Sequence, residues 1–532
     1  MSRGITRREA GLAIAATAAL GVADPRRAFA QRAKRGGTLV YGKPKDAVKI
    51  DPQNVTDGES FDVTRHIFEN LVQFVPLKTE VRPGLATSWT TSKDGLTWTF
   101  KLRRGVKFHD GTPFDAQAVV FNFERMAYPD NPYHKGSFSY WESFFNGYPG
   151  ILKKISAPDE HTVVIELTQP NAPFITNLAT SSFGIMSPDS IKKYGEDVFK
   201  NPIGTGPFRF VEWIPNERIV LERNKEYWDK GKPILDRVVF RTIPENSVRL
   251  LELEKGSIQL MHGINADDAA RIRNNKALKL YAQTGMNVCY VAFQVQKKPF
   301  TDKKVRQALN MAVNKPAIVK ALFGEFGQVA KNPLPPTLWG YNDKVKDYPY
   351  DPNRAKAMLA EAGYPNGFKC ELWAMPVARP YMPDARKAAE ALQADFRKVG
   401  VETEIVTIDW GVYLERTKKG DYDGMAILGW TGDNGDPDNF VFTLLGGPSR
   451  GGNNIAQYQN PKVDEMLLKA QQLTDQRERA KLYEESQVLL KEDAPWITLD
   501  HSTQLGAGRA NVVGYDLHPT GAHLVIDVGL AS

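Results

Sequence analysis

Apolar and polar residues alternate along this chain in patterns that predict both strands and helices. Thr97 to Leu102 (TWTFKL) alternates the two kinds of residue, as a half-buried strand should. Ala116 to Met126 (AQAVVFNFERM) has apolar residues at helical spacing, with Asp115 as the expected N-cap. The same patterns predict strands over Gly37 to Gly42, Val163 to Leu167 and Arg237 to Thr242, and helices over Asp302 to Val313, Asp384 to Val399 and Val463 to Gln472. Interleaved helices and strands predict an α/β fold.

The distribution of these elements indicates two lobes. The segment from Met286 to Asp500 alternates helix and strand regularly, whereas the segments on either side are richer in strands and turns. We therefore expect the first unit to be inserted into the second, with crossings near Gly285 and His501. Two crossings form a hinge, and a hinge beside a cleft suits closure on a ligand.

The first thirty residues have the order of a secretory signal peptide. They comprise a basic start, a run of small and apolar residues and a small-x-small cleavage pattern, at Arg3 to Arg8, Ala10 to Val22 and Ala28-Phe29-Ala30. The apolar run is shorter than the ~20 residues that a membrane helix needs. We therefore expect export to the periplasm with cleavage after Ala30.

The sequence leaves two export routes open. Arg7 and Arg8 form a twin-arginine pair, and Arg26 and Arg27 near the cleavage site disfavour the general secretion route. An ordinary signal peptide with a chance arginine pair is the alternative, because Ala10 and Gly11 stand where twin-arginine signals usually carry larger apolar residues. Both routes take the protein out of the cytoplasm.

The composition of the remaining chain narrows the function classes. It has no second long apolar run and no cysteine at the cleavage site, so we expect neither membrane insertion nor a lipid anchor there. About 500 residues are too many for one core, which indicates two or three structural units. The formal net charge is +7, of which the arginine-rich first thirty residues supply a large share. The mild, evenly spread remainder argues against nucleic-acid binding.

Cys289 and Cys370 are the two cysteines of the chain. An oxidising compartment permits a disulfide between them. Each lies in a stretch typical of a buried strand, so two buried thiols are equally compatible with the sequence. The choice depends on the separation of the two Cα atoms.

Motifs for catalysis or metal binding are not recognisable. His109-Asp110 resembles a catalytic pair only in residue type, and no serine elbow or Cys-His pair stands out. The eight histidines show no metal-ligand spacing. The acidic run from Asp433 to Asp438 fails as a calcium loop, because Gly435 and Pro437 occupy alternate positions where ligands are needed. We expect no enzyme, no cofactor and no metal site.

Several long stretches resemble the extracytoplasmic peptide-binding proteins of ABC importers, solute-binding protein family 5, and most closely its dipeptide-binding members. These stretches are Leu102 to Val120, Asn201 to Phe208 (NPIGTGPF), Glu222 to Asp229, Lys303 to Lys315, Leu372 to Tyr381 (LWAMPVARPY) and Leu428 to Phe440 (LGWTGDNGDPDNF). The resemblance covers essentially the whole chain after the signal peptide. It implies a soluble receptor that captures small peptides and delivers them to the membrane subunits of an ABC permease, acting as a monomer.

The resemblance also implies a particular architecture. It is the two-lobed periplasmic binding protein fold, type II and similar to the large cluster C group, with an extra subdomain in the larger lobe. We expect lobe I to comprise residues 31–69, 201–285 and 501–532, the extra subdomain 70–200, and lobe II 286–500.

In the related dipeptide-binding proteins an Asp of the GWTGD stretch holds the ligand ammonium and an Arg of the PVxRPY stretch holds the carboxylate. The matching residues are Asp433 and Arg379, with Tyr381 as a second contact. Gly432 would permit close approach of the ligand, and Trp430 would wall the cleft. From the residues alone, Asp433 in a turn, Arg379 in a surface ion pair and Trp430 in the core remain alternatives.

Two further points about the ligand follow from the resemblance. The ligand main chain would pair with a strand edge of the larger lobe, for which Gly42 to Asp51 is the expected segment. Receptors of this kind also resemble receptors for oligopeptides, glutathione, haem and other small solutes. These ligands are the alternative to a dipeptide.

Overall fold

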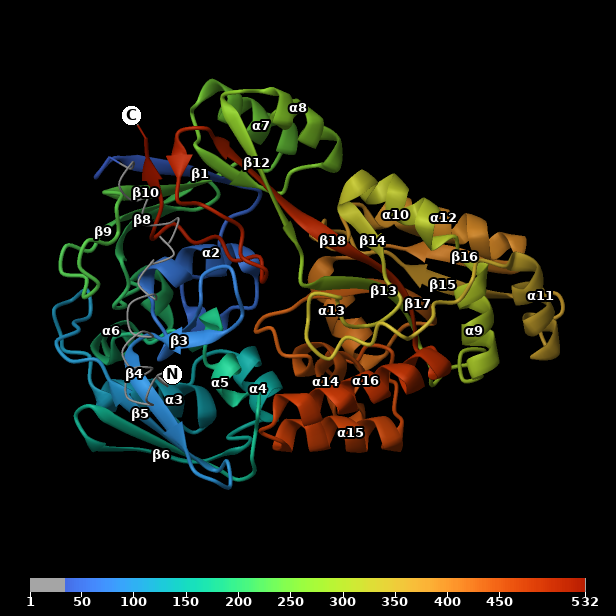
Figure 1. Ribbon diagram of the computed structural model, residues 1–532, viewed down its shortest axis with the longest axis horizontal. Helices are drawn as coiled ribbons and strands as arrows, with labels where there is room; N and C mark the ends of the chain where they lie inside the picture. The colour runs from blue at the N-terminus through green and yellow to red at the C-terminus, as the bar shows by residue number, and fades with distance from the viewer. Residues whose placement is uncertain (1–33, 532) are drawn as a thin grey trace, which may run out of the picture.

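The structure is a computed structural model that describes residues 34–531. The signal peptide expected over residues 1–30 lies outside this range. The described chain forms two lobes side by side, with a further sheet below lobe I (Figure 1). Among the described helices none is both long and apolar enough to cross a bilayer.

A twelve-stranded sheet runs through both lobes, in the order β16-β15-β17-β13-β18-β11-β1-β10-β9-β8, with β12 and β14 paired to β18. Its lobe I strands are β1 (Thr38–Lys43), β8 (Phe208–Ile214), β9 (Arg218–Arg223), β10 (Arg237–Thr242), β11 (Leu260–His262) and β12 (Leu278–Thr284). Lobe I also contains α2 (Gly58–Ile67), α7 (Asn246–Lys255) and α8 (Ala269–Asn274), and the pair β19 (Val512–Val513) with β20 (Gly529–Leu530). The pair β2 (Val72–Phe74) with β3 (Val81–Pro83) and the helix α6 (Pro188–Tyr194) fall within the segment expected for the subdomain.

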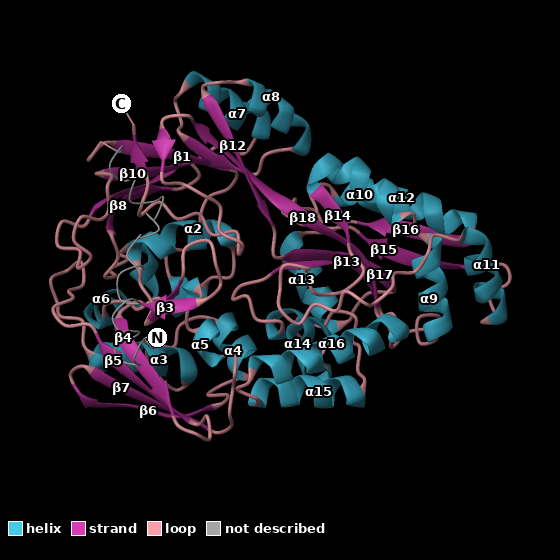
Figure 2. Cartoon of the chain, in the orientation of Figure 1, coloured by secondary structure: helices cyan, strands magenta, loops and turns pink. Residues whose placement is uncertain are grey.

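Lobe II carries the other end of the sheet, with helices on both faces (Figure 2). Its strands are β13 (Asn287–Phe293), β14 (Gly327–Val329), β15 (Phe368–Trp373), β16 (Val401–Val406) and β17 (Gly424–Thr431). Its helices are α9 (Lys303–Ala312), α10 (Lys315–Phe323), α11 (Pro352–Glu361), α12 (Ala385–Lys398), α13 (Trp410–Lys419), α14 (Asp438–Leu445), α15 (Pro461–Gln472) and α16 (Gln476–Asp493).

The subdomain is built on a separate antiparallel sheet in the order β4-β5-β7-β6. Its elements are β4 (Ala86–Thr91), β5 (Thr97–Leu102), α3 (Ala116–Ala127), α4 (Ser139–Phe145), β6 (Leu152–Asp159), β7 (Thr162–Leu167) and α5 (Phe174–Asn177). Short 3₁₀ turns occupy Pro52–Asn54, Ser181–Phe183, Gly195–Lys200, Ala266–Asp268, Gly324–Phe326 and Gly447–Ser449. The two lobes and the subdomain have separate hydrophobic cores.

The strands and helices expected from the hydrophobic pattern are confirmed. Capping side chains close in sequence set the starts of the helices. The Asp115 carboxylate accepts a hydrogen bond of 2.8 Å from the backbone N–H of Ala118 and so caps α3. Asp302 and Asp384 cap α9 and α12 in the same way. The α/β class with two lobes and a subdomain is therefore confirmed, while the residue boundaries of the three parts remain predictions.

The two crossings between the lobes lie side by side. One is the short link from β12 to β13, and the other is β18 (Trp496–Arg509), which pairs with β13 and β14 at its start and with β11 and β12 at its end. The fully buried Asn287 side chain ties the crossings together, accepting from the Ser502 N–H at 2.8 Å and donating to the Ser502 carbonyl at 3.1 Å. The Gly285 N–H donates to the same carbonyl at 3.0 Å. The crossings are thus one hydrogen-bonded unit.

The two cysteines are free thiols. Cys289 lies on β13 and Cys370 on β15, with β17 between these strands in the sheet. Burial raises the pKa of both thiols, so neither is activated for exchange. Of the two states that the sequence left open, the structure has the unpaired one.

A buried ion pair joins the subdomain to lobe I. Arg125 on α3 donates to the Asp51 carboxylate at 2.7 Å and to the Gln53 side-chain oxygen at 2.8 Å. The side chains of Arg125 and Asp51 are 2% and 3% exposed. Removing one member of such a pair leaves the other charge buried without compensation.

We therefore expect Arg125→Ala to lower the free energy of unfolding by about 3–5 kcal/mol. Chemical denaturation followed by circular dichroism measures this loss. Arg209→Ala, at an exposed position, is the control and should change stability by no more than about 0.5 kcal/mol. Equal effects of the two variants would show that the Asp51–Arg125 pair does not hold the subdomain in place.

Candidate ligand-binding site

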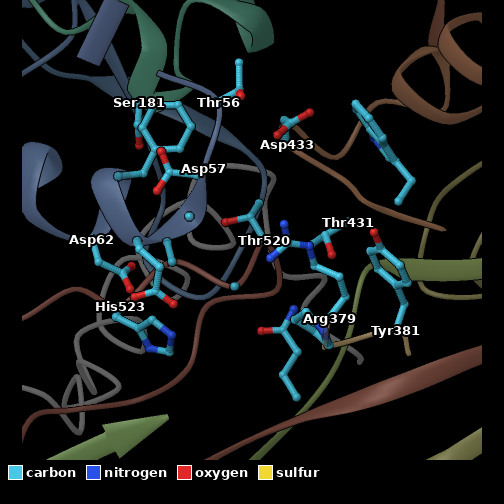
Figure 3. Close-up of a pocket in the computed structure, with 18 of the residues that line it drawn as sticks. Thr56, Asp57, Asp62, Ser181, Arg379, Tyr381, Thr431, Asp433, Thr520 and His523 are labelled. Atoms are coloured by element: carbon cyan, nitrogen blue, oxygen red, sulfur yellow. The ribbon is translucent and has the colours of Figure 1, made fainter. Parts of the chain in front are cut away.

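A large cavity of about 2470 Å³ lies between the lobes. Lobe I, the subdomain and lobe II all contribute side chains to its lining (Figure 3). Typical small-molecule pockets measure ~300–1,000 Å³, so this cavity has room for a ligand larger than a single amino acid. Four of the five residues expected to bind ligand line it: Arg379, Tyr381, Trp430 and Asp433.

Asp433 follows β17 and holds its carboxylate at the cavity wall. One carboxylate oxygen accepts a 2.9 Å hydrogen bond from the Tyr140 hydroxyl of the subdomain, and the other accepts a 3.1 Å bond from the Asn439 side-chain amide. Burial raises the pKa of Asp433 to about 6, although these two hydrogen bonds act in the opposite direction. The ionised carboxylate of Asp433 therefore has a high free energy in this site, and a cationic partner would stabilise it.

Asn439 fixes the geometry around Asp433. Its side-chain oxygen accepts from the backbone N–H of Asp433 at 2.9 Å and from the Trp430 indole N–H at 3.0 Å. One buried amide on α14 therefore sets the positions of both cavity residues. The role expected for Trp430 as a wall of the cavity is compatible with this arrangement, because Trp430 is half-buried.

Arg379 is a cation that has no anionic partner in the described chain. No carboxylate of residues 34–531 lies within 4.0 Å of its guanidinium, which stands 5.0 Å from the Trp410 ring centroid. The guanidinium points toward Thr431 and Thr520 in the cavity (Figure 3). Backbone hydrogen bonds of 2.9 Å in both directions between Arg379 and Met382 shape this loop. A surface ion pair, the alternative role considered for Arg379, is absent within the part of the chain that the structure describes.

Tyr381 is buried at 7% exposure and packs over the cavity end of β17. A Cβ atom at Gly429 would lie 2.3 Å from its ring and 2.5 Å from the Val288 carbonyl oxygen. Glycine at 429 is therefore what allows the tyrosine ring to lie against the strand. Tyr381 keeps its hydroxyl protonated, because burial raises its pKa.

Gly432 does not have the expected role. It is buried outside the cavity lining, and a Cβ atom there would lie 2.5 Å from the Phe440 ring and 2.9 Å from the Met286 side chain. Its N–H donates to the Met286 carbonyl oxygen at 2.7 Å. The absence of a side chain thus serves packing against the lobe crossing and does not serve approach of the ligand.

The loops of Arg379 and Asp433 are both attached to the lobe crossings. The Ser502 hydroxyl donates to the Pro380 carbonyl at 2.7 Å, next to Arg379. On the other side, Gly432 bonds to Met286 as described, and the Met286 N–H bonds to the Pro519 carbonyl at 3.3 Å. The spacing of the two charged side chains is therefore set by the crossings.

A buried bidentate ion pair supports the turn after Asp433. The Arg479 guanidinium on α16 donates to both oxygens of Asp436 at 2.8 Å, and the two side chains are 6% and 4% exposed. Bidentate pairing of this kind fixes geometry as well as charge. The acidic composition of this turn therefore serves the fold through Asp436, while Asp433 faces the cavity.

At the cavity, main-chain groups of β17 have no strand partner on one side, whereas Gly42 of β1 is paired on both sides. Gly42 is paired to β10 on one side and to β11 on the other, so the expected segment Gly42 to Asp51 has no free strand edge at its first residue. Pro44 to Val48 of the same segment line the cavity, and pairing of the ligand main chain with them stays a prediction. On β17, strand β15 pairs only with Gly424 to Ala426, which leaves Gly429 to Thr431 without a strand partner on that side at the cavity.

Sequence reasoning missed three residues that shape the site: Tyr140, Trp410 and Asn439. Tyr140 lies in the subdomain and Trp410 at the start of α13, and neither has a sequence signal that connects it with Asp433 or Arg379. Asn439 is in the same LGWTGDNGDPDNF stretch as Asp433, but its two acceptor contacts depend on the turn between them.

A cavity between two lobes that are joined by paired crossings, with charged groups on its wall, defines a two-lobed solute-binding protein. The chain belongs to the bacterial extracellular solute-binding proteins, family 5, whose model matches residues 80–452. It is 43% identical over 502 residues to the dipeptide-binding protein of Escherichia coli K12, covering 91% of this chain and 93% of that one.

Two solved structures are similar over nearly the whole chain. One is the ABC transporter-associated periplasmic binding protein DppA of Helicobacter pylori with the peptide STSA, at 36% identity and a TM-score of 0.85, covering 94% of this chain and 99% of that one. The other is a dipeptide-binding protein of Pseudoalteromonas sp. SM9913 with Met-Leu, at 32% identity and a TM-score of 0.84, covering 93% and 100%.

We expect Asn439→Ala to lower the free energy of unfolding by about 1–3 kcal/mol, because it leaves two N–H donors without their acceptor. Thermal and chemical denaturation of the ligand-free protein measure this. Asn274→Ala, at the exposed end of α8, is the matched control and should be nearly neutral. A neutral Asn439→Ala would mean that other groups hold Trp430 and Asp433.

Proposed function

We propose that this protein is the extracytoplasmic receptor of an ABC importer and that it captures dipeptides in the interlobe cavity. The observation that supports this most is the presence on one wall of two opposite charges: the Arg379 guanidinium, which has no carboxylate partner in the described chain, and the buried carboxylate of Asp433. The name of the Escherichia coli relative and the peptides bound in the two similar structures agree with this proposal.

A dipeptide at neutral pH is a zwitterion, which suits these two groups. Asp433 binds the ligand ammonium, and Arg379 binds the carboxylate, for which its planar fork allows two parallel hydrogen bonds. Because the crossings fix both loops, the distance between the two charges acts as a ruler for peptide length. Tyr381 and Trp430 supply apolar walls between them.

The ligand backbone pairs with the free edge of β17. Gly429 to Thr431 line the cavity, and no strand pairs with them on the side where β15 pairs with the start of β17. An extended peptide can add to such an edge through main-chain hydrogen bonds, which do not depend on its side chains. This arrangement gives affinity for many dipeptides of different sequence.

The remaining features of the proposed receptor follow from its place in an importer. The protein is exported by a signal peptide cleaved after Ala30, acts in the periplasm as a monomer and passes its cargo to the membrane subunits of the permease. It carries out no catalysis. The lobes close by a hinge at the crossings near Gly285 and His501, with lobe I formed by residues 31–69, 201–285 and 501–532, the subdomain by 70–200 and lobe II by 286–500.

Longer peptides are the second candidate, and the size of the cavity favours them. A volume of about 2470 Å³ exceeds what a dipeptide needs, and one similar structure holds the four-residue peptide STSA. Isothermal titration calorimetry with alanine peptides of two to four residues separates the two candidates. The dipeptide receptor binds the shortest peptide most tightly, whereas an oligopeptide receptor binds the longest.

We expect Arg379→Ala and Asp433→Asn each to weaken binding of alanyl-alanine by about 2–5 kcal/mol, because each leaves a ligand charge unpaired. Chemically blocked ligands sharpen the test. Amidation of the ligand carboxylate should cost affinity in the native protein and nothing further in Arg379→Ala. Acetylation of the ligand amine should behave in the same way with Asp433→Asn.

The control for charge alone is Arg386→Ala, because this exposed arginine on α12 pairs with Glu390 away from the cavity. It should bind alanyl-alanine as the native protein does. Equal affinity of the native protein for the free and the amidated dipeptide would overturn the role of Arg379. Mass spectrometry of co-purified ligand tests the class directly, and a single non-peptide solute would overturn the dipeptide proposal.

Binding should also depend on pH through Asp433. Only the ionised carboxylate pairs with an ammonium, and burial raises the pKa of Asp433 to about 6. Affinity should therefore be highest above this value and fall by up to about tenfold for each pH unit below it, while the ligand carboxyl stays ionised. Calorimetry between pH 5 and 7 measures the slope. Asp433→Asn should bind weakly with a flat profile, and an equally steep profile in that variant would assign the titration to another group.

A further inference from the structure

The lobe I wall of the cavity holds a second group of chemically reactive side chains. Asp62 on α2, His262 at the end of β11 and His523 in the C-terminal segment each offer one ligand atom, and these atoms lie within 4.8 Å of one another. All three residues line the cavity, and Figure 3 shows Asp62 and His523 on the opposite side from Arg379 and Tyr381. None of them belongs to the proposed peptide contacts.

Two of the three side chains carry polar atoms for which the described chain supplies no hydrogen-bond partner. Asp62 is 3% exposed, its carboxylate oxygens accept no hydrogen bond from residues 34–531, and the Arg65 guanidinium is 3.9 Å away, which is too far for one. His523 is 8% exposed, and its Nε2 atom has no partner among residues 34–531. Buried polar groups are normally hydrogen-bonded, paired or bound to a metal, so these two point to a ligand in the cavity.

The other ring nitrogens are held in the manner of metal-binding histidines. The Tyr41 hydroxyl lies 2.9 Å from His262 Nδ1, and the Tyr515 hydroxyl lies 2.7 Å from His523 Nδ1. The Nε2 atom of His523 has no partner in the described chain, whereas the Nε2 atom of His262 lies 3.2 Å from a carboxylate oxygen of Glu59. Outer contacts to the second nitrogen orient an imidazole for metal binding.

We propose that Asp62, His262 and His523 form a binding site for a borderline divalent transition metal such as Zn²⁺, with Glu59 as a fourth oxygen ligand. Two imidazoles and carboxylate oxygens suit this class of ion better than Ca²⁺ or Mg²⁺, which favour oxygen alone. The imidazole rings are stacked at 4.5 Å with an interplanar angle of 20°. Two parallel rings cannot both direct a lone pair at one ion, so binding requires one ring to leave the stack and its tyrosine contact, while the other ring keeps the orientation that its tyrosine contact gives.

The metal site does not depend on the peptide proposal. The absence of metal-ligand spacing in the sequence led to the expectation of no metal site, because spacing rules apply to ligands that are close in the chain. Here α2, β11 and the C-terminal segment bring the ligands together only in the folded protein. An ion at this wall would face the peptide cavity and add a Lewis-acidic contact for ligands that carry a metal-binding side chain.

Calorimetry with ZnCl₂ alone, on the full exported protein freed of metal with a chelator and of peptide, tests the site. We expect one equivalent to bind in the native protein. Asp62→Asn and His523→Gln should each weaken binding at least about tenfold, since even the outer contacts of a metal site are worth that much. His161→Gln, in the β6–β7 turn of the subdomain, is the matched control and should bind as the native protein does. With CuCl₂, electron paramagnetic resonance should show nitrogen splitting that His523→Gln reduces.

Titration of alanyl-alanine separates folding and function from metal binding. Asp62→Asn and His523→Gln should still bind the dipeptide, which shows that they are folded, and Arg379→Ala should still bind Zn²⁺. Absence of Zn²⁺ binding in the native protein, or unchanged binding in both variants, would overturn the metal site. If the native protein bound Zn²⁺ but did not bind the dipeptide, the proposed function would be overturned and the metal site would remain supported.

Discussion

The crossings between the lobes are the part of this protein on which the rest depends. The strand β18 belongs to both lobes, and the buried Asn287 amide ties it to the link between β12 and β13 through two hydrogen bonds with Ser502. The same unit holds the loop of Arg379 through the Pro380 carbonyl and the loop of Asp433 through Gly432 and Met286. The connection of the lobes and the positions of these two loops thus depend on one small network of side-chain and backbone hydrogen bonds.

This arrangement explains how the proposed receptor can close its lobes and keep the spacing of the two charged side chains. Arg379 and Asp433 both lie on lobe II, so movement of the lobes does not change their spacing. The subdomain reaches the site across the cavity through the hydrogen bond from Tyr140 to Asp433. Closure of the lobes as proposed would therefore change the contact between Tyr140 and Asp433, while the separation of the two charged groups stays constant.

The cavity has two chemically different walls. The lobe II wall presents a guanidinium, a carboxylate, aromatic rings and a free strand edge, which suit the main chain of a small peptide. The lobe I wall presents two imidazoles and two carboxylates, with Lys43 and Arg65 close to the carboxylates. Recognition of backbone charges and recognition of a metal-binding group can therefore occur in one cavity without sharing residues.

The sequence by itself determined the elements whose signals are local. The helix α3 begins after Asp115 because that side chain caps it, and the alternation over Thr97 to Leu102 gave a half-buried strand with the same ends. The similarity of LWAMPVARPY and LGWTGDNGDPDNF to peptide-binding proteins directed attention to Arg379 and Asp433, both of which line the cavity.

Only the tertiary structure decided the features that depend on contacts between distant segments. Gly432 packs against Phe440 and Met286, which its neighbours in sequence do not reveal. Gly42 of β1 has no free edge, because strands far along the chain pair with both of its sides. The cluster of Asp62, His262 and His523 exists for the same reason. Hydrophobic pattern and capping act over a few residues, whereas strand order and cavity walls are set by packing of the whole chain.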